Sequence, residues 1–379
     1  EADIDAGAQV ADLRIGQQQM VEIAKALALN TRILIMDEPT SALSSIEVEV
    51  LFRVIDDLKN QGVSIVYISH RLEELVQIGD YITVLRDGNL IQEASMDDID
   101  VPWIISSMVG DDIDRELQHA STSTGEEVLK IEELRLPHVS GGFTVDHLNL
   151  TLYIGEILGI YGLMGAGRSE LFECLMGLQK EATGKVFLEG KDVTVGTVDD
   201  HIRAGLALIP EDRQRDGLVQ VLDVSDNMTL SSLWKFIKWV HIQRDKLKEA
   251  VLAMIGDLSI KVTSPQVIIS SLSGGNQQKV IIGKALLTEP KVLLMDEPTR
   301  GIDVGAKGDV FAIMNELAGR GLGIIFVTSE LKEIMAVSDR IVVMSNGKIT
   351  GEYPREEATE ELIVAASAIG HKDIEHSLH

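Results

Sequence analysis

The hydrophobic pattern of this chain predicts short strands that alternate with amphipathic helices. Residues 145–152 and 156–161 are expected to form strands, and 33–36 and 292–295 are continuous apolar runs. Such runs are typical of parallel strands that are buried on both faces of a sheet. Apolar residues at helical spacing predict helices at 169–178, at 245–258 and after Ser273. The pattern therefore predicts an α/β fold.

The chain contains a long internal repeat. Residues 13–90 align without a gap on residues 272–349, at an offset of 259, the distance from Leu13 to Leu272. Residues 37–40 thereby fall on 296–299. A period this long indicates two copies of a whole domain, not a solenoid. The counterpart of Gly162 would fall before residue 1, so we expect about a hundred residues of the first domain to precede this sequence.

The repeat predicts four segments. We expect residues 1–118 to be the C-terminal part of the first domain, 119–127 a small, polar linker, 128–370 the second domain and 371–379 a tail. Within the second domain, 225–270 contains Trp234, Phe236 and Trp239 before the amphipathic segment at 245–258. This region is predicted to be a mostly helical subdomain.

Composition narrows the class of protein. The 379 residues carry 34 basic and 60 acidic side chains, a net charge of −26. This charge argues against nonspecific nucleic-acid binding, which needs cations to neutralise phosphates. The one cysteine, Cys174, cannot form an internal disulfide, which favours a reducing compartment. We recognise neither a membrane-spanning apolar run nor a signal peptide, so any membrane should lie beside the protein.

Residues 162–169 have the spacing of a phosphate-binding loop. Two glycines, Gly162 and Gly167, are separated by four residues and followed by a basic residue and a serine, between a predicted strand and a predicted helix. Backbone N–H groups of such a loop surround phosphates, and the Ser169 hydroxyl can bind Mg2+. Arg168 stands where lysine is usual. The alternative is a glycine-rich turn without a function.

Two further motifs predict anion and cation chemistry. Asp-Glu pairs follow both continuous apolar strands, as Asp37 with Glu38 and as Asp296 with Glu297. The aspartate can support Mg2+ and the glutamate can orient or deprotonate water, unless the pair is only a solvated acidic turn. Residues 272–278 open a helix with a serine and two glycines, which predicts a second anion site or a simple helix cap.

Together these motifs resemble those of ABC-type ATPases. The resemblance includes 162–169, 272–278, 293–298, 301–303 and a strand that ends near Ser329. Residues 210–213, 277–279 and 299–307 are similar to the tandem ATPase subunit of bacterial monosaccharide importers of the ribose, galactose and xylose class, from 11 to 370. The resemblance implies two P-loop ATPase domains, each with a RecA-like core sheet and a helical subdomain, the first incomplete. It also implies ATP and Mg2+ as cofactors.

In that family two ATPase domains pack head to tail, and each ATP lies between the phosphate loop of one and the signature helix of the other. The first site would use Asp37 for Mg2+, Glu38 and His70 for catalysis, and Ser273, Gly274 and Gly275 from the other domain. The second site would use the following residues: Gly162, Gly165, Gly167, Arg168 and Ser169 of the loop, Glu211 where glutamine is usual, Asp296 and Ser169 for Mg2+, Glu297 for catalysis, and Gly16 from the other domain.

The second site departs from the family pattern at three places. Besides Arg168, Ser329 stands where the first copy has His70, and the facing signature contains Arg14 in place of serine. We therefore expect this site to bind ATP more than it hydrolyses it. The sequence as given, without a first phosphate loop, is expected to be weakly active. His70 has the alternative of closing a core strand.

The resemblance implies a subunit that energises import of a monosaccharide or related polyol. Its partners would be membrane permease subunits and, indirectly, a periplasmic or extracellular sugar-binding protein, with no nucleic acid. It would be peripheral, at the cytoplasmic face of the membrane. The alternatives are a soluble tandem ABC ATPase of the ribosome, which the charge disfavours, and a nucleotide-sensing scaffold. Phe143 is the nearest candidate to stack on adenine.

Overall fold

The structure, a computed structural model, divides the chain into two compact units, Glu1–Asp112 and Ile113–His379. The residues that it describes are 7–10, 13, 15–27, 31–37, 39–40, 45–69, 72–86, 89–100, 103–104, 107, 123–138, 141–163 and 165–369. No helix in these ranges is long and apolar enough to cross a bilayer.

The first unit contains helices and two pairs of strands within its described ranges, and residues 103, 104 and 107 are also helical. The parallel pair is β1 (Ile33–Asp37) with β2 (Ser64–Ile68), and the antiparallel pair is β3 (Tyr81–Arg86) with β4 (Asn89–Ser95). The helical elements are α1 (Ile15–Leu27), α2 (Ser45–Asn60), α3 (Leu72–Ile78) and the 3-10 turn η2 (Met96–Asp98).

The prediction that 33–36 is buried on both faces is wrong. Leu34 and Met36 pack on α2 residues such as Leu51, but Ile33 and Ile35 are 64% and 67% exposed. The side chains of β1 alternate across the strand, and the described helices of this unit cover only one of its faces. Here a continuous apolar run therefore predicts a strand, but it does not predict that both faces of the strand are buried.

The second unit is built on a six-stranded sheet with the order β10-β13-β14-β7-β15-β16, in which β16 alone is antiparallel to its neighbour. These strands are β7 (Ile157–Gly162), β10 (Leu206–Ile209), β13 (Val292–Asp296), β14 (Gly323–Val327), β15 (Arg340–Ser345) and β16 (Lys348–Pro354). An antiparallel sheet contains β5 (Glu127–Pro137), β6 (Phe143–Tyr153), β8 (Thr183–Leu188) and β9 (Lys191–Asp192).

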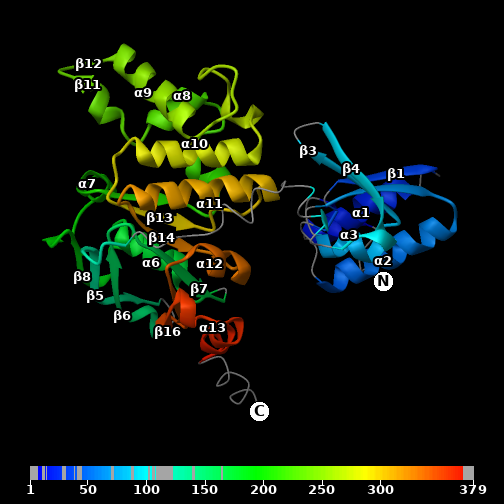
Figure 1. The fold of residues 1–379 in the computed structure, drawn as a ribbon, viewed down its shortest axis with the longest axis horizontal. Coiled ribbons are helices and arrows are strands. Elements are labelled where there is room, and N and C mark those ends of the chain that lie inside the picture. Colours follow the sequence, from blue (N-terminus) through cyan, green and yellow to red (C-terminus); the bar gives the residue numbers. More distant parts are fainter. Residues whose placement is uncertain are drawn as a thin grey trace. The chain divides into compact units, whose positions relative to one another are not determined.

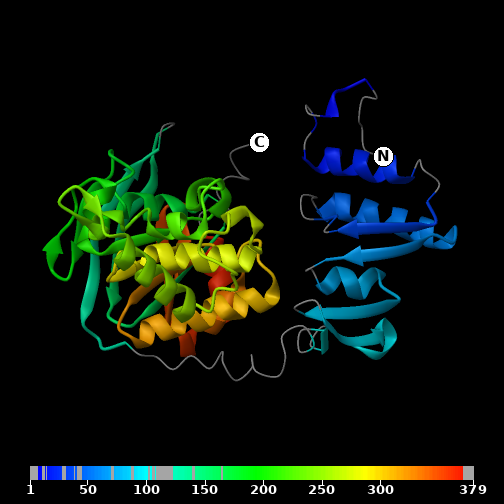
Figure 2. The same ribbon diagram turned by 90° about the horizontal axis from the view of Figure 1, so that it is seen from above.

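Helices cover both faces of the six-stranded sheet. Figures 1 and 2 show α10 (Gly274–Leu286) and α11 (Val304–Gly319) side by side on one face, and Figure 1 shows α6 (Arg168–Leu175) and the antiparallel sheet on the other. All five residues of β13 and of β14 are buried. The remaining helices are α7 (Val198–Ala204), α8 (Val224–Thr229), α9 (Arg244–Asp257), α12 (Leu331–Val337) and α13 (Glu360–Ser367), with short turns at η3 (Arg213–Gly217), η4 (Leu233–Phe236), η5 (Ile269–Ser271) and η6 (Arg355–Glu357).

Two sequence-based boundaries need correction. The helix predicted at 169–178 ends at Leu175, because Gly177 takes a left-handed conformation and closes the helix with a bond to Cys174. The region 225–270 is helical at α8 and α9, but it also contains an antiparallel hairpin of β11 (Ile237–Lys238) and β12 (His241–Ile242). Trp239 lies in the hairpin turn with φ +59° and not in a helix.

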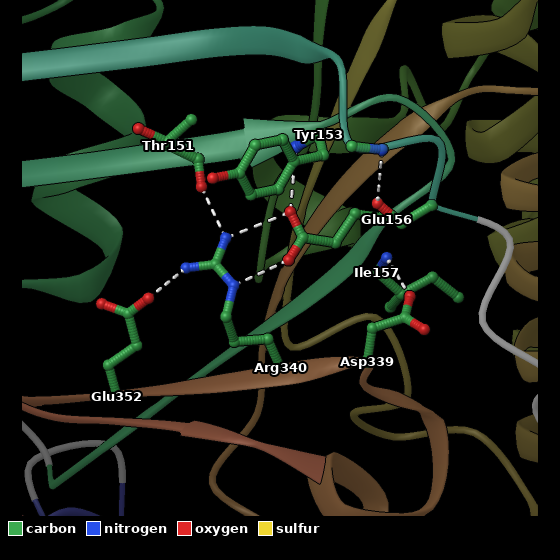
Figure 3. A network of polar contacts seen from close by, with 9 residues as sticks. Thr151, Tyr153, Glu156, Ile157, Asp339, Arg340 and Glu352 are labelled. Carbon is green, nitrogen blue, oxygen red and sulfur yellow. Dashed lines mark hydrogen bonds and ion pairs between the residues drawn. The ribbon is translucent and has the colours of Figure 1, made fainter.

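A buried cluster around Arg340 holds the amino end of β7 (Figure 3). The guanidinium donates to both carboxylate oxygens of Glu156 at 2.8 and 3.1 Å, to Glu352 at 2.6 Å and to the carbonyl of Thr151 at 2.6 Å. The exposed fractions of the Arg340 and Glu156 side chains are 16% and 4%. Because a buried charge is costly without partners, these contacts help to join the start of β7 to β15, β6 and β16.

Candidate functional site

The loop between β7 and α6 adopts the backbone conformation that its glycines allow. Gly165 and Gly167 have φ of +80° and +93°, in the left-handed region. A Cβ on Gly162 would lie 2.5 Å from the carbonyl oxygen of Met344, and one on Gly167 would lie 2.4 Å from that of Thr144. Glycine is therefore required at Gly162 and Gly167 by close backbone approach.

The loop is supported by the turn between β15 and β16. Gly347 has φ +77°, and its N–H donates to the carbonyl of Ala166 at 3.0 Å. A Cβ on Gly347 would also meet the Thr144 carbonyl, at 2.5 Å. Sequence reasoning missed Thr144 and Gly347 as supports of this loop; the signal for Gly347 was its alignment with Gly88 in the repeat.

The loop can receive phosphate. Within the described residues, the N–H groups of Gly165, Gly167, Arg168 and Ser169 form no hydrogen bond. They lie at the N-terminus of α6, where the helix dipole favours negative charge. The loop between Leu163 and Arg168 therefore offers several backbone donors to an anion.

Asp296 and Ser169 lie side by side at this loop. The side chain of Asp296 ends β13 and is only 6% exposed, and burial raises its pKa, although a hydrogen bond from the Ser169 hydroxyl lowers it. No cluster of three acidic, histidine or cysteine ligands occurs among the described residues. Mg2+ typically binds one or two protein oxygens, phosphate oxygens and water, which fits this pair.

Glu297 follows Asp296 in a strained conformation. Its φ is +45°, which is uncommon for a residue other than glycine, and its N–H donates to Val327 at 2.9 Å. Burial raises the pKa of its carboxyl, while hydrogen bonds from Ser329 and the charge of Arg168 lower it. The residue that replaces the histidine of the first copy, Ser329, therefore contacts the glutamate at this site.

The Arg168 side chain reaches across the loop to the ends of β13 and β14. Its Nη1 atom donates to the Thr328 carbonyl at 3.3 Å and lies 3.7 Å from Oε1 of Glu297. Both charged side chains are nearly buried, with exposed fractions of 11% and 12%. The guanidinium is thus directed at the end of β14 and at the glutamate, and its planar group of donors can contact both, whereas a lysine has a single point charge.

A cleft of about 860 Å³ joins these residues to the segment after β10. Glu211 and Arg300 both line this cleft and form an ion pair with each other. Arg213 donates to the carbonyls of Arg300 at 2.5 Å and Gly301 at 2.6 Å. The cleft lining includes Ser169, Asp296, Glu211, Arg213 and Arg300.

Arg213 also touches the start of α10. A Cβ on Gly274 would lie 2.9 Å from its Nη2 atom, so the glycine leaves room for the guanidinium. Ser273 is the N-cap of α10 without a side-chain capping bond, and Gly275 packs against Ala306, where a Cβ would come within 2.5 Å. Sequence reasoning missed the hydrogen bonds from Arg213 to Arg300 and Gly301, because these two residues lie 87 and 88 positions after Arg213 in the chain.

We predict that Arg213→Ala lowers the free energy of unfolding by about 1 to 3 kcal/mol, because two charge-assisted hydrogen bonds are lost. The apparent Tm of the full chain should fall by several degrees in calorimetry. Arg215→Ala is the matched control, since Arg215 is exposed and pairs only with its neighbour Asp216 within the described residues. An equal decrease in Tm for both variants would contradict the inference that Arg213 stabilises the fold through its bonds to Arg300 and Gly301.

The repeat extends to a buried hydrogen-bond cluster. In the second unit, Glu333 accepts from Thr299 at 2.7 Å and from Thr328 at 2.9 Å. In the first unit, Glu74 accepts from Thr40 at 2.8 Å and from Ser69 at 3.3 Å. These residues correspond at the offset of the repeat, with Thr40 on Thr299, Ser69 on Thr328 and Glu74 on Glu333. Each copy thus uses a buried glutamate to join two strand ends.

The structure brings together only part of the predicted residue set. The predicted residues of the second unit lie around one cleft and the adjoining loop; they are 162–169 except 164, Glu211, Asp296 and Glu297. Asp37 ends β1 of the first unit. Glu38, His70 and Arg14 lie outside the described residues. Gly16 is in α1. Phe143 starts β6, is 43% exposed and meets His147 edge to face at 6.5 Å.

Known proteins share this sequence and architecture. The family model described as ABC transporter matches residues 2–41 and 145–300. A ribose import ATP-binding protein of Rhodopirellula baltica is 49% identical over 370 residues, covering 97% of this chain and 72% of its own. A xylose import ATP-binding protein of Geobacillus kaustophilus is 43% identical over 370 residues, covering 97% and 73%.

Solved structures show the same fold. A nucleotide-free ATP-binding cassette of an ABC transporter superposes with a TM-score of 0.55 at 24% identity, covering 67% of this chain and 99% of its own. The ADP conformation of another such cassette has a TM-score of 0.54 at 23% identity, with the same coverage.

Proposed function

Since this chain belongs to the ABC transporter family, we propose that it is the ATPase subunit that energises import of a monosaccharide, of the ribose or xylose kind, through a separate membrane permease. The observation that carries the proposal is the phosphate loop of the second unit, with free backbone donors beside a serine and a buried aspartate. The proposal is supported by the names of relatives that cover nearly the whole chain.

In the second site, the loop from Gly162 to Ser169 binds the phosphates of ATP. Backbone N–H groups of Gly165 and Gly167 and the charge of Arg168 hold them. Ser169 and Asp296 hold Mg2+, which neutralises phosphate charge when bound. Glu211, paired with Arg300, lines the same cleft as Ser169 and Asp296.

Glu297 orients water in this site. Its carboxylate accepts hydrogen bonds from Ser329 and lies near Arg168, which compete with a water for its oxygens. We therefore propose that the second site binds ATP more readily than it hydrolyses it. Gly16 of the first unit would complete the site.

In the first site, Asp37, Glu38 and His70 act with Ser273, Gly274 and Gly275 from the second domain. The domain organisation that we propose is a first ATPase domain up to 118, a linker at 119–127, a second ATPase domain at 128–370 and a tail. It is supported by the buried glutamate clusters at Glu74 and Glu333, which occur at corresponding positions.

We further propose a peripheral position at the cytoplasmic face of the membrane, with permease subunits and, indirectly, a sugar-binding protein as partners. The net charge of −26 disfavours action on the ribosome, because RNA binding needs cations to neutralise phosphates. A scaffold that senses nucleotide without hydrolysis would be distinguished by an ATPase assay on the full chain with its permease.

We expect the full chain to co-purify from membranes when it is expressed with its permease, because its relatives are import ATP-binding proteins. The measurement is recovery of the chain with the detergent-solubilised, affinity-tagged permease. The control is the same preparation without the permease. Recovery only in soluble or ribosomal fractions in the presence of the permease would contradict an import role.

A further inference from the structure

The hairpin β11–β12 displays apolar side chains to solvent. Trp239 and Val240 at its turn are 91% and 86% exposed, and Ile237 and Ile242, which pair across its strands, are 45% and 46% exposed. Figure 1 shows the hairpin at the end of the second unit that lies opposite α13, beyond α9. Adjacent apolar side chains this exposed typically mark a surface that binds something.

The turn of this hairpin has an unfavourable backbone conformation. Trp239 has φ +59°, a conformation that glycine or asparagine adopts at a hairpin turn with less strain. The other tryptophan nearby, Trp234, has Arg203 over its ring at 4.4 Å. Trp239 has no ring contact of this kind within the described residues. An exposed aromatic side chain in a strained turn points to a role outside the fold.

The hairpin is basic in an acidic protein. From 233 to 248 the chain has five lysines and arginines and one acidic residue, whereas the whole chain has a net charge of −26. Lys238, His241 and Arg244 are exposed, and Lys238 and Arg244 form no ion pair within the described part of the chain. Lys246 and Lys248 at the start of α9 are also exposed. Lys235 is paired with Glu289 at 3.1 Å, so the positive charge that can meet an anionic partner is that of Lys238, Arg244, Lys246 and Lys248.

We propose that this hairpin binds the surface of an anionic phospholipid membrane. Trp239 and Val240 would enter the interface between headgroups and acyl chains, where tryptophan is favoured, and the surrounding lysines and arginine would lie among the headgroups. Because the rest of the chain is acidic, an anionic surface repels it and selects the orientation in which the hairpin faces the lipid. The inference rests on the proposed function, which places the chain at a membrane.

The test uses the full chain and protein-free vesicles of phosphatidylcholine with and without phosphatidylglycerol. We expect cosedimentation only with the phosphatidylglycerol vesicles, weakened by added salt, and quenching of tryptophan fluorescence by brominated lipid. Trp239→Ser should weaken binding by about tenfold or more, and Lys238→Gln by about fivefold. Quenching should fall strongly in Trp239→Ser.

Two substitutions outside the hairpin serve as controls. Val195→Ser removes an apolar side chain that is 95% exposed, and Lys191→Gln removes an exposed charge. Both should bind vesicles as the unsubstituted chain does. Equal binding by all variants, absence of vesicle binding, or membrane recovery only when the permease is present would overturn the proposal, the last by assigning the hairpin to a protein partner. Calorimetry of ATP with the same variants tests the proposed function separately, since the hairpin is outside the nucleotide site.

Discussion

Replacing Gly167 with valine is expected to reduce ATP affinity by at least about a hundredfold. A Cβ at this position would lie 2.4 Å from the backbone oxygen of Thr144, and its φ of +93° is unfavourable for a β-branched residue. Thr144 is part of β6 and is held in its sheet, so the added side chain must displace the loop instead. The N–H groups of the displaced loop would no longer point toward one phosphate. Isothermal calorimetry of ATP with the full chain measures the loss.

The matched control is Gly190→Ala. Gly190 also has a positive φ, +73°, but a Cβ added there would have no atom within 4 Å, and the residue is in the turn between β8 and β9. This substitution should cost about 1 kcal/mol of stability through backbone strain and leave ATP affinity unchanged. If Gly167→Val binds ATP as the unsubstituted chain does, the loop does not hold the phosphates.

Asp296→Asn should have two opposite effects. It should weaken the Mg2+ dependence of nucleotide binding by about 10- to 100-fold, because the buried carboxylate beside Ser169 is lost. It should also raise the apparent Tm of the nucleotide-free chain at pH 7, because burial raises the pKa of this carboxyl and makes its charged form costly. Calorimetry with and without Mg2+ and a thermal scan measure the two effects.

The sign follows from the direction of the pKa shift. Below the unfolded-state pKa, near 3.8, both states hold the proton and Asn gives no advantage. As pH rises through the raised folded-state pKa, the aspartate protein loses stability that the asparagine protein keeps. Asp257→Asn, at an exposed position, is the control and should change neither quantity. A lower Tm for Asp296→Asn at pH 7 would show that the carboxylate stabilises the nucleotide-free site.

The sequence predicted the features that depend on local order. The loop at 162–169 was predictable because the strand, the glycines and the helix follow one another within a few residues. The strand at 292–296 was predictable from one apolar run. The same reasoning was wrong about burial of Ile33 and Ile35, since burial depends on which helices cover the sheet and not on the strand itself.

The features that sequence analysis missed depend on contacts between distant segments. Arg213 meets Arg300 and Gly301 only because β10 and β13 are neighbours in the sheet. The hairpin at Trp239 was missed within a region predicted to be mostly helical. Its turn has none of the glycine or asparagine residues that mark one.

The cluster around Arg340 gives the two ends of β7 different stiffness. Opening the backbone at Ile157 requires the guanidinium to leave Glu156, Glu352 and Thr151, while the N–H of Ile157 itself donates to Asp339 at 2.8 Å. The opposite end of the strand passes into the glycine loop, where Gly347 donates to Ala166 at 3.0 Å and the Arg168 side chain donates to the Thr328 carbonyl at 3.3 Å. We expect local opening to occur at the loop more readily than at the amino end of β7, because the N–H groups of Gly165, Gly167, Arg168 and Ser169 form no hydrogen bond within the described residues. Binding of phosphate to these N–H groups would order the loop at one end of β7, while the contacts of Arg340 already fix the other end. We therefore expect nucleotide binding to need no rearrangement of the sheet.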